Sequence, residues 1–187
     1  MDIPFNYKSE KQSHYLPGSV GIFFVLLGML VFPTYATADI EASEANIRTA
    51  FIHRILQYTQ WDNANSDTLS LCAVGSEQDF QSLKLLDRRK ITSDTEIAVS
   101  EYSESVAVEC HVVIVGTDKK MDPLLLPNSA LLICNGCDVN RARAAVDLIR
   151  VNDQIRYNVN IQLASQSGVK FRSDVLKWAN KVVGLHE

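Results

Sequence analysis

Four cysteines are the residues of this chain whose types and spacing point most directly to chemistry. Two of them form the motif Cys134-Asn135-Gly136-Cys137 at the end of a short apolar run. A strand, a Cys-x-x-Cys pair and a helix occur in this order in thioredoxin-like proteins, where the helix N-terminus stabilises a reactive thiolate. Two interpretations follow, a thiol redox protein and an inert disulfide that tightens a turn. We favour the inert disulfide because the other elements of a thioredoxin-like fold are not recognisable.

The other two cysteines, Cys72 and Cys110, lie in the short apolar runs at residues 70–75 and 109–116, and both runs end in glycine. Runs of this kind are typical of strands buried on both faces of a sheet. The pattern therefore predicts two neighbouring strands that a disulfide would join, provided that the protein folds in an oxidising compartment.

The N-terminal segment indicates which compartment this is. Residues 20–32 form an uncharged apolar run that is too short to cross a hydrocarbon core of ~30 Å comfortably as a helix. The segment Ala36-Thr37-Ala38 fits the small-x-small pattern of a signal peptidase site. We predict that residues 1–38 are a signal peptide and that residues 39–187 form a periplasmic domain. The alternative is a retained signal anchor, which places the same domain across the membrane.

Export makes disulfides chemically permitted. An even number of cysteines in an oxidising compartment is most simply explained by two disulfides. Of the three possible connectivities, Cys72–Cys110 with Cys134–Cys137 is favoured, because the last two cysteines are very close in the sequence.

Composition and missing motifs narrow the function further. The chain has 187 residues, 47% of them hydrophobic, and a formal net charge of −4 without a basic block, which argues against a nucleic-acid partner. It contains no P-loop, dinucleotide-binding glycine cluster, Gly-x-Ser-x-Gly or His-Glu-x-x-His motif. His53, His111 and His186 are too scattered to suggest a metal centre, and His111 is expected to be a core or interface residue. We predict a protein that is not an enzyme, with no metal and no cofactor.

A small-molecule-binding module is the second hypothesis. Trp61, Tyr157 or Trp178 could stack on a ligand, while Arg156 or Arg172 pairs with its charge. We expect Trp178 to be a core residue instead, since its spacing matches the apolar face of a helix.

These residues are positioned by a predicted mixture of helices and strands. Apolar residues at helical spacing predict a helix over residues 42–60 that ends in a turn at Gln60-Trp61-Asp62-Asn63. Period-two alternation on both sides of Asn152-Asp153 predicts a β-hairpin. The other predicted elements are helices at 77–86, 161–167 and 173–183, strands at 96–102 and 130–133, and at most one or two helical turns at 118–126. We predict one α/β domain with a mixed central β-sheet flanked by helices, a C-terminal β-hairpin and a terminal helix.

The order of these segments resembles the YfiR family. The resemblance runs in order over residues 44–183. Most of its weight comes from the first helix, the Leu-Cys-x-x-Gly strand at 71–75 and the Arg-Tyr-Asn-Val-Asn hairpin strand at 156–160. Further matching segments are 110–115 and the Ser-x-x-Leu-Lys-x-Ala helix at 173–179.

The resemblance implies an α/β fold, a homodimer and a regulatory role in the periplasm. In that family, YfiR binds the periplasmic sensor part of the inner-membrane diguanylate cyclase YfiN and holds it inactive, and the outer-membrane lipoprotein YfiB sequesters YfiR. A negative regulator of cyclic di-GMP and biofilm formation is therefore implied. Paired cysteines in the family agree with a Cys72–Cys110 disulfide. The chain departs from the family at Arg143-Ala144-Ala145, where glycines are common, and in its close Cys134–Cys137 pair.

Overall fold

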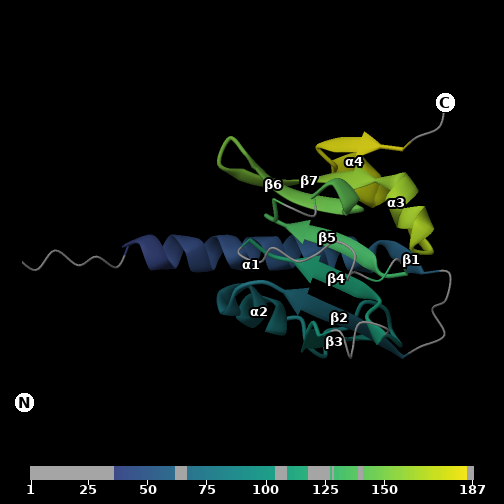
Figure 1. Cartoon of the computed structure of the whole chain (residues 1–187), viewed down its shortest axis with the longest axis horizontal. Coiled ribbons are helices and arrows are strands. Elements are labelled where there is room, and N and C mark those ends of the chain that lie inside the picture. Colours follow the sequence, from purple (N-terminus) through teal and green to yellow (C-terminus); the bar gives the residue numbers. More distant parts are fainter. Residues whose placement is uncertain are drawn as a thin grey trace, which may run out of the picture. The chain divides into compact units, whose positions relative to one another are not determined.

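A single mixed sheet is the centre of this protein (Figure 1). The computed structural model describes residues 36–61, 67–103, 109–117, 127, 129–138 and 141–184. Within them, seven strands follow the spatial order β3-β2-β4-β5-β6-β7-β9. They are β2 (Thr68–Val74), β3 (Glu96–Glu101), β4 (Val112–Val115), β5 (Leu131–Asn135), β6 (Val146–Val151), β7 (Gln154–Asn160) and β9 (Lys181–Val183). The strands from β3 to β6 are parallel, β7 is antiparallel to β6, and β9 is parallel to β7. The predicted mixed α/β domain is confirmed.

One face of the sheet carries the larger core and the α-helices. The described helices are α1 (Ala36–Gln57), α2 (Glu77–Lys84), α3 (Ile161–Gln166), α4 (Ser173–Trp178) and the short 3₁₀ helix η3 (Arg141–Arg143). Ile52, Ile55 and Leu56 recur at the spacing of one helix face, so α1 buries them against strand residues such as Leu71 and Ile133. Among the described residues, no helix has the length and apolar character needed to cross a membrane.

The second face of the sheet carries a smaller core that contains all four cysteines. Successive side chains of a strand point to opposite faces, so Cys72 and Val113 join this cluster while Leu71 and Val112 join the first one. All four of these residues are buried. The prediction of strands buried on both faces is therefore confirmed.

The predicted hairpin is formed by β6 and β7, with Leu148 opposite Tyr157. Its turn is Asn152-Asp153, and both residues have positive φ values of 48° and 57°. A two-residue loop with positive φ at both positions matches the twist of the flanking strands, and Asn and Asp tolerate this conformation better than most residues.

The predicted turn after the first helix was wrong at Gln60 and Trp61, and its other two residues, 62 and 63, lie outside the described residues. The helix ends at Gln57, and Thr59–Trp61 form strand β1, which pairs antiparallel with β8 (Val169–Phe171) in a separate two-stranded sheet. The pairing partner comes from the other end of the chain, so the local sequence carried only the turn signal.

The predicted C-terminal helix was wrong in its second half. α4 ends at Trp178, and the valines 182 and 183 lie in β9, where they pair with Val159 and Asn160 of β7. β-branched residues lose side-chain freedom in a helix and pack well in a strand. As a consequence Trp178 is 69% exposed, and the expectation of a core residue was wrong.

The remaining predicted elements divide into those observed and those outside the described residues. α2, α3, β3 and β5 lie close to the predicted segments 77–86, 161–167, 96–102 and 130–133. The segment 118–126 and residues 1–35 of the predicted signal peptide lie outside the described residues.

Candidate functional site

Both predicted disulfides are present. Cys72 in β2 is joined to Cys110, two residues before β4, with their Cα atoms 5.8 Å apart. Cys134 at the end of β5 is joined to Cys137, with their Cα atoms 5.3 Å apart. All four cysteines are at least 95% buried. The two crosslinks therefore stabilise the second face of the sheet from inside its core.

The surroundings of Cys134 and Cys137 favour the inert interpretation over thiol exchange. These cysteines are 0% and 2% exposed, whereas a reactive thiol must be reached by its partner and is activated at a helix N-terminus. In the described residues that follow, the first helical element is the three-residue η3, Arg141–Arg143.

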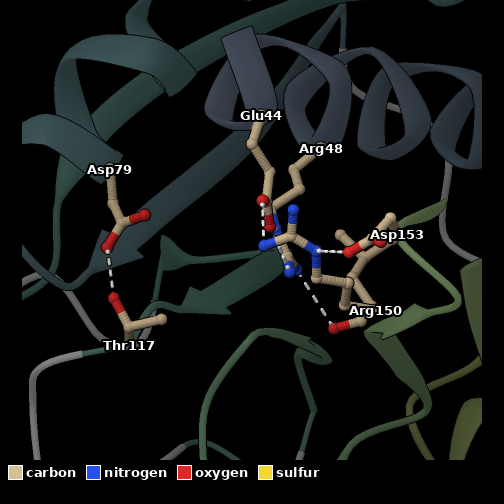
Figure 2. Close-up of polar contacts among 7 residues, drawn as sticks. Glu44, Arg48, Asp79, Thr117, Arg150 and Asp153 are labelled. Carbon is tan, nitrogen blue, oxygen red and sulfur yellow. Dashed lines mark hydrogen bonds and ion pairs between the residues drawn. The ribbon is translucent and has the colours of Figure 1, made fainter. Parts of the chain in front are cut away.

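Polar side chains gather where the parallel strands end, and Figure 2 shows them. Glu44 and Arg48 on α1 form an ion pair of 2.8 Å, and Arg150 at the end of β6 lies 3.1 Å from the same carboxylate. Asp153 in the hairpin turn lies 3.6 Å from Arg150. We call Glu44, Arg48, Arg150 and Asp153 the carboxyl-edge cluster. Its two acids and two bases neutralise one another, so the cluster leaves no excess charge for a ligand.

Asp79 occupies the neighbouring position between β2 and β4. Its backbone N–H donates to the Ser76 hydroxyl at 3.2 Å, and its carboxylate accepts from the Ser76 backbone N–H at 3.4 Å, which completes a capping box at the start of α2. Thr117 donates to the same carboxylate at 3.5 Å (Figure 2). Asp79 is therefore engaged in holding the helix N-terminus.

Asp147 is a buried carboxylate that the sequence analysis did not single out. It is 7% exposed, lies opposite Cys134 in the sheet register, and has Arg141 at 3.4 Å. Burial raises the pKa of the Asp147 carboxyl group above 3.8, and the nearby Arg141 guanidinium opposes this rise. The buried Asp147 carboxylate thus pairs with the half-exposed side chain of Arg141 at the surface of the sheet.

A hollow of about 290 Å³ lies between α1 and α4 and brings together two of the predicted ligand residues, Arg156 and Tyr157. Trp178 and Arg54 also line it, with the apolar side chains Phe51, Ile55 and Val175 at its base. We call this cavity the α1/α4 hollow. It combines an apolar base with two guanidinium groups and the carboxylate of Asp174, which suits a partly apolar ligand or peptide group that carries a negative charge, with or without a positive one.

The hydroxyl group of Tyr157 is already engaged inside this structure. It donates to the carbonyl of Val175 at 2.7 Å and so ties α4 to the sheet. Only the ring of Tyr157 is left to contact a ligand. Tyr157 thus has a structural role as well as a position in the hollow.

The other two predicted ligand residues lie elsewhere. Tyr58 lines the α1/α4 hollow. The Arg172 guanidinium is 5.6 Å from the centre of the Tyr58 ring and the Arg54 guanidinium is 4.9 Å from it, so Arg172 lies next to the hollow without lining it. Trp61 lines a separate cavity of about 350 Å³ together with His111. His111 was expected to be a core or interface residue. It is exposed, so the core alternative was wrong and the interface alternative stays a prediction; its Nδ1 accepts from the backbone N–H of Ser70 at 3.1 Å.

Arg54 and Tyr58 were missed in the search for ligand residues. Arg54 lies in the last turn of α1 and Tyr58 directly follows the helix, four positions later, and this spacing brings side chains together at a helix end. A cation and an aromatic residue at this spacing were the sequence signal by which both residues could have been found.

Among the described residues, no group of three or more His, Cys, Asp or Glu side chains is arranged to hold a metal ion.

Comparison with protein families is informative over most of the chain. No curated protein matches the sequence. The sequence profile of the YfiR/HmsC-like family matches residues 45–180, a range that includes α1 from residue 45 onward, the central sheet up to β7, both disulfides and α4. The chain therefore belongs to the YfiR/HmsC-like family.

Proposed function

We propose that this protein is a periplasmic negative regulator that binds and inhibits an inner-membrane diguanylate cyclase of the YfiN type. Inhibition lowers cyclic di-GMP and so reduces biofilm formation. An outer-membrane lipoprotein of the YfiB type sequesters the regulator and thereby releases the cyclase. The protein acts by contact rather than by catalysis, and it acts as a homodimer.

The observation that carries this proposal is the family match over residues 45–180. Two further features support it. The disulfides Cys72–Cys110 and Cys134–Cys137 agree with folding in an oxidising compartment such as the periplasm. The carboxylates Glu44, Asp79 and Asp147 are each paired inside the structure, which suits a structural role better than acid or base catalysis.

Deletion and complementation test the proposal. Cells that lack the protein should contain more cyclic di-GMP and form more biofilm, and the full chain supplied in trans should reverse both changes. The cyclase should also co-purify with the tagged full chain from the membrane fraction. Unchanged cyclic di-GMP in the deletion strain, together with no cyclase in the purified material, would refute the proposal.

The α1/α4 hollow supports a second candidate function, a periplasmic small-molecule-binding module. Its volume of about 290 Å³ and its lining by Arg54, Arg156, Asp174 and Trp178 fit a small ligand that has an apolar part and at least one negative charge, such as an amino acid. A thermal-shift screen against nucleotides and amino acids tests this, because a ligand that binds only the native state raises the melting temperature. Arg156→Gln is the matched variant and should abolish any shift that arises in the hollow.

A further inference from the structure

The cavity that contains Trp61 lies at the amino-terminal edge of the parallel strands, where these strands begin. β2 starts at Thr68, and His111 and Ser129 come shortly before β4 and β5. The β1–β8 ribbon and the segment 91–95 before β3 supply further walls. We call this cavity of about 350 Å³ the amino-edge cavity. It is separate from the carboxyl-edge cluster, which lies where the strands end.

The amino-edge cavity differs from the α1/α4 hollow in its charge. Its described lining residues include no carboxylate, ammonium or guanidinium group, and His111 is the titratable side chain among them. The hollow, in contrast, is lined by Arg54, Arg156 and Asp174. A charged ligand would lose hydration in the amino-edge cavity without gaining an opposite charge. The cavity therefore favours an uncharged ligand.

The polar groups around the cavity include both donors and acceptors. The Ser167 hydroxyl donates to the carbonyl of Ala130 at 2.9 Å, which leaves its oxygen to accept from a ligand. The Thr92 hydroxyl oxygen accepts from the backbone N–H groups of residues 94 and 95, which leaves its hydrogen to donate. Because Nδ1 of His111 accepts a backbone N–H at 3.1 Å, its Nε2 carries the ring hydrogen and donates as well. Hydroxyl groups are the uncharged groups that pair with both kinds of partner.

Trp61 gives the cavity an aromatic wall, and Leu69 and Ile91 add apolar surface beside it. An indole ring presents a broad apolar face on which the C–H groups of a ligand can pack. The indole nitrogen of Trp61 is buried and has no hydrogen-bond partner among the described residues, although a buried tryptophan N–H usually finds one. A ligand oxygen would supply the missing acceptor once the ring turns toward the cavity.

From these contacts we propose that the amino-edge cavity binds a neutral sugar. Its C–H face packs on Trp61, and its hydroxyl groups bond to Thr92, His111 and Ser167. Sugars combine an apolar face with a rim of hydroxyl groups and no charge, which is the combination that the lining offers. The volume of about 350 Å³ lies near the lower end of the range for ligand pockets, so a single sugar ring is the expected size. This site is independent of the contact with a cyclase.

Calorimetric titration of the full chain with D-glucose, D-galactose and D-mannose tests the ligand class. At least one of these sugars should bind with a Kd of about 1 mM or tighter. The matching uronate, in which a carboxylate replaces the terminal CH₂OH group, should bind at least roughly tenfold more weakly, because its charge finds no partner in the cavity. The titrations are run at about pH 8, where histidine side chains are uncharged.

Two variants test the location. The chain has two tryptophans, so Trp178→Phe leaves Trp61 as the single source of tryptophan fluorescence. Its emission should change on titration with the sugar and give the same Kd as calorimetry. His111→Ala removes one donor from an exposed position and should weaken binding by about threefold to tenfold. Arg156→Gln in the α1/α4 hollow is the control and should leave the Kd unchanged, and thermal unfolding checks that each variant is folded.

The outcomes separate this inference from the proposed function. If none of the three neutral sugars binds, the inference is overturned, and a uronate that binds as tightly as its neutral sugar overturns it too. Binding that leaves both the Trp61 emission and the affinity of His111→Ala unchanged would place the sugar elsewhere, which also overturns it. None of these results bears on co-purification of the cyclase, so the proposed regulator is tested separately.

Discussion

The two disulfides differ in the length of chain that they close, and this difference predicts unequal contributions to stability. Cys72–Cys110 has a sequence separation of 38 and Cys134–Cys137 a separation of 3. All four cysteines are buried, so Cys→Ala in either pair removes two buried sulfur atoms. Packing losses are therefore comparable, and the two double variants differ chiefly in loop closure.

The size of the difference follows from the entropy of the unfolded chain. A crosslink that closes a loop of this length stabilises by about 4 kcal/mol at 25 °C, and one that closes the short loop by about 2 kcal/mol. We expect Cys72→Ala/Cys110→Ala to lose ~2 kcal/mol more free energy of unfolding than Cys134→Ala/Cys137→Ala. For a protein of this size, that corresponds to a difference of about 4–8 °C in Tm.

Urea denaturation of both double variants measures this, with the slope of each curve used to check that unfolding stays two-state. Alanine is used because serine would add a buried hydroxyl group at each site and a cost unrelated to the crosslink. Reduction of the unmodified protein should lower its stability by at least as much as the Cys72–Cys110 variant. Equal losses in the two variants, or a larger loss from the Cys134–Cys137 pair, would refute the reasoning.

Three further changes test other contacts. Tyr157→Phe leaves the buried carbonyl of Val175 without its donor and should lower the free energy of unfolding by about 1–3 kcal/mol in urea titrations. Burial raises the pKa of the Asp147 carboxyl group above 3.8 in the folded protein. The contribution of this group to the free energy of unfolding is therefore complete below pH 3.8, where it is protonated, and is lost as the pH rises through the raised pKa of the folded state. The stability of Asp147→Asn relative to the unmodified protein should therefore increase from about pH 3 to about pH 7, and a decrease would show that the charged form is favoured in the fold. Gly116→Ala places a methyl group against the Asp79 carboxylate and should cost at least ~1 kcal/mol. That cost should shrink in an Asp79→Ala background, and additive losses would contradict the contact.

Local patterns predicted the elements whose stability comes from their own residues. Asn152-Asp153 favour the positive φ values that a two-residue hairpin requires, so the β6–β7 hairpin could be predicted with its turn. The cysteine-containing runs could be predicted as strands because apolar side chains on both faces of a sheet leave no polar alternation.

The three-residue strands could not be predicted because each depends on a distant segment. β1 exists only by pairing with β8, and β9 only by pairing with β7. Valines at 182 and 183 also fit a helical spacing, which extended the predicted helix too far. The wrong expectation of a buried Trp178 followed from the same error. Trp178 is the last residue of α4 and is exposed, whereas the predicted longer helix would have placed it on an apolar face.

The β1–β8 pairing also explains why the predicted ligand residues separate into two groups. The N–H of Arg172 donates to the carbonyl of Tyr58 at 3.0 Å, which brings Arg172 to the end of the ribbon near the α1/α4 hollow. Trp61 pairs with Val169 at the other end of the same ribbon and faces a different cavity. Residue types alone gave the candidates, but the antiparallel register decides which of them meet.

The order of the parallel strands is one that is found in nucleotide-binding sheets, but the side chains at the corresponding position are already paired with one another. Strands β3, β2, β4, β5 and β6 follow the order 2-1-3-4-5 of doubly wound sheets, which bind nucleotides where the order reverses, here between β2 and β4. At that point Asp79 caps α2 with its own carboxylate, so the helix N-terminus that would attract a phosphate already has a negative partner. Gly116 lies directly against this carboxylate, and Arg48 beyond it is paired with Glu44. A phosphate would have to displace these internal contacts. The strand order therefore does not bring a nucleotide site with it, and the α1/α4 hollow, which lies away from this position, is the better candidate for a binding site.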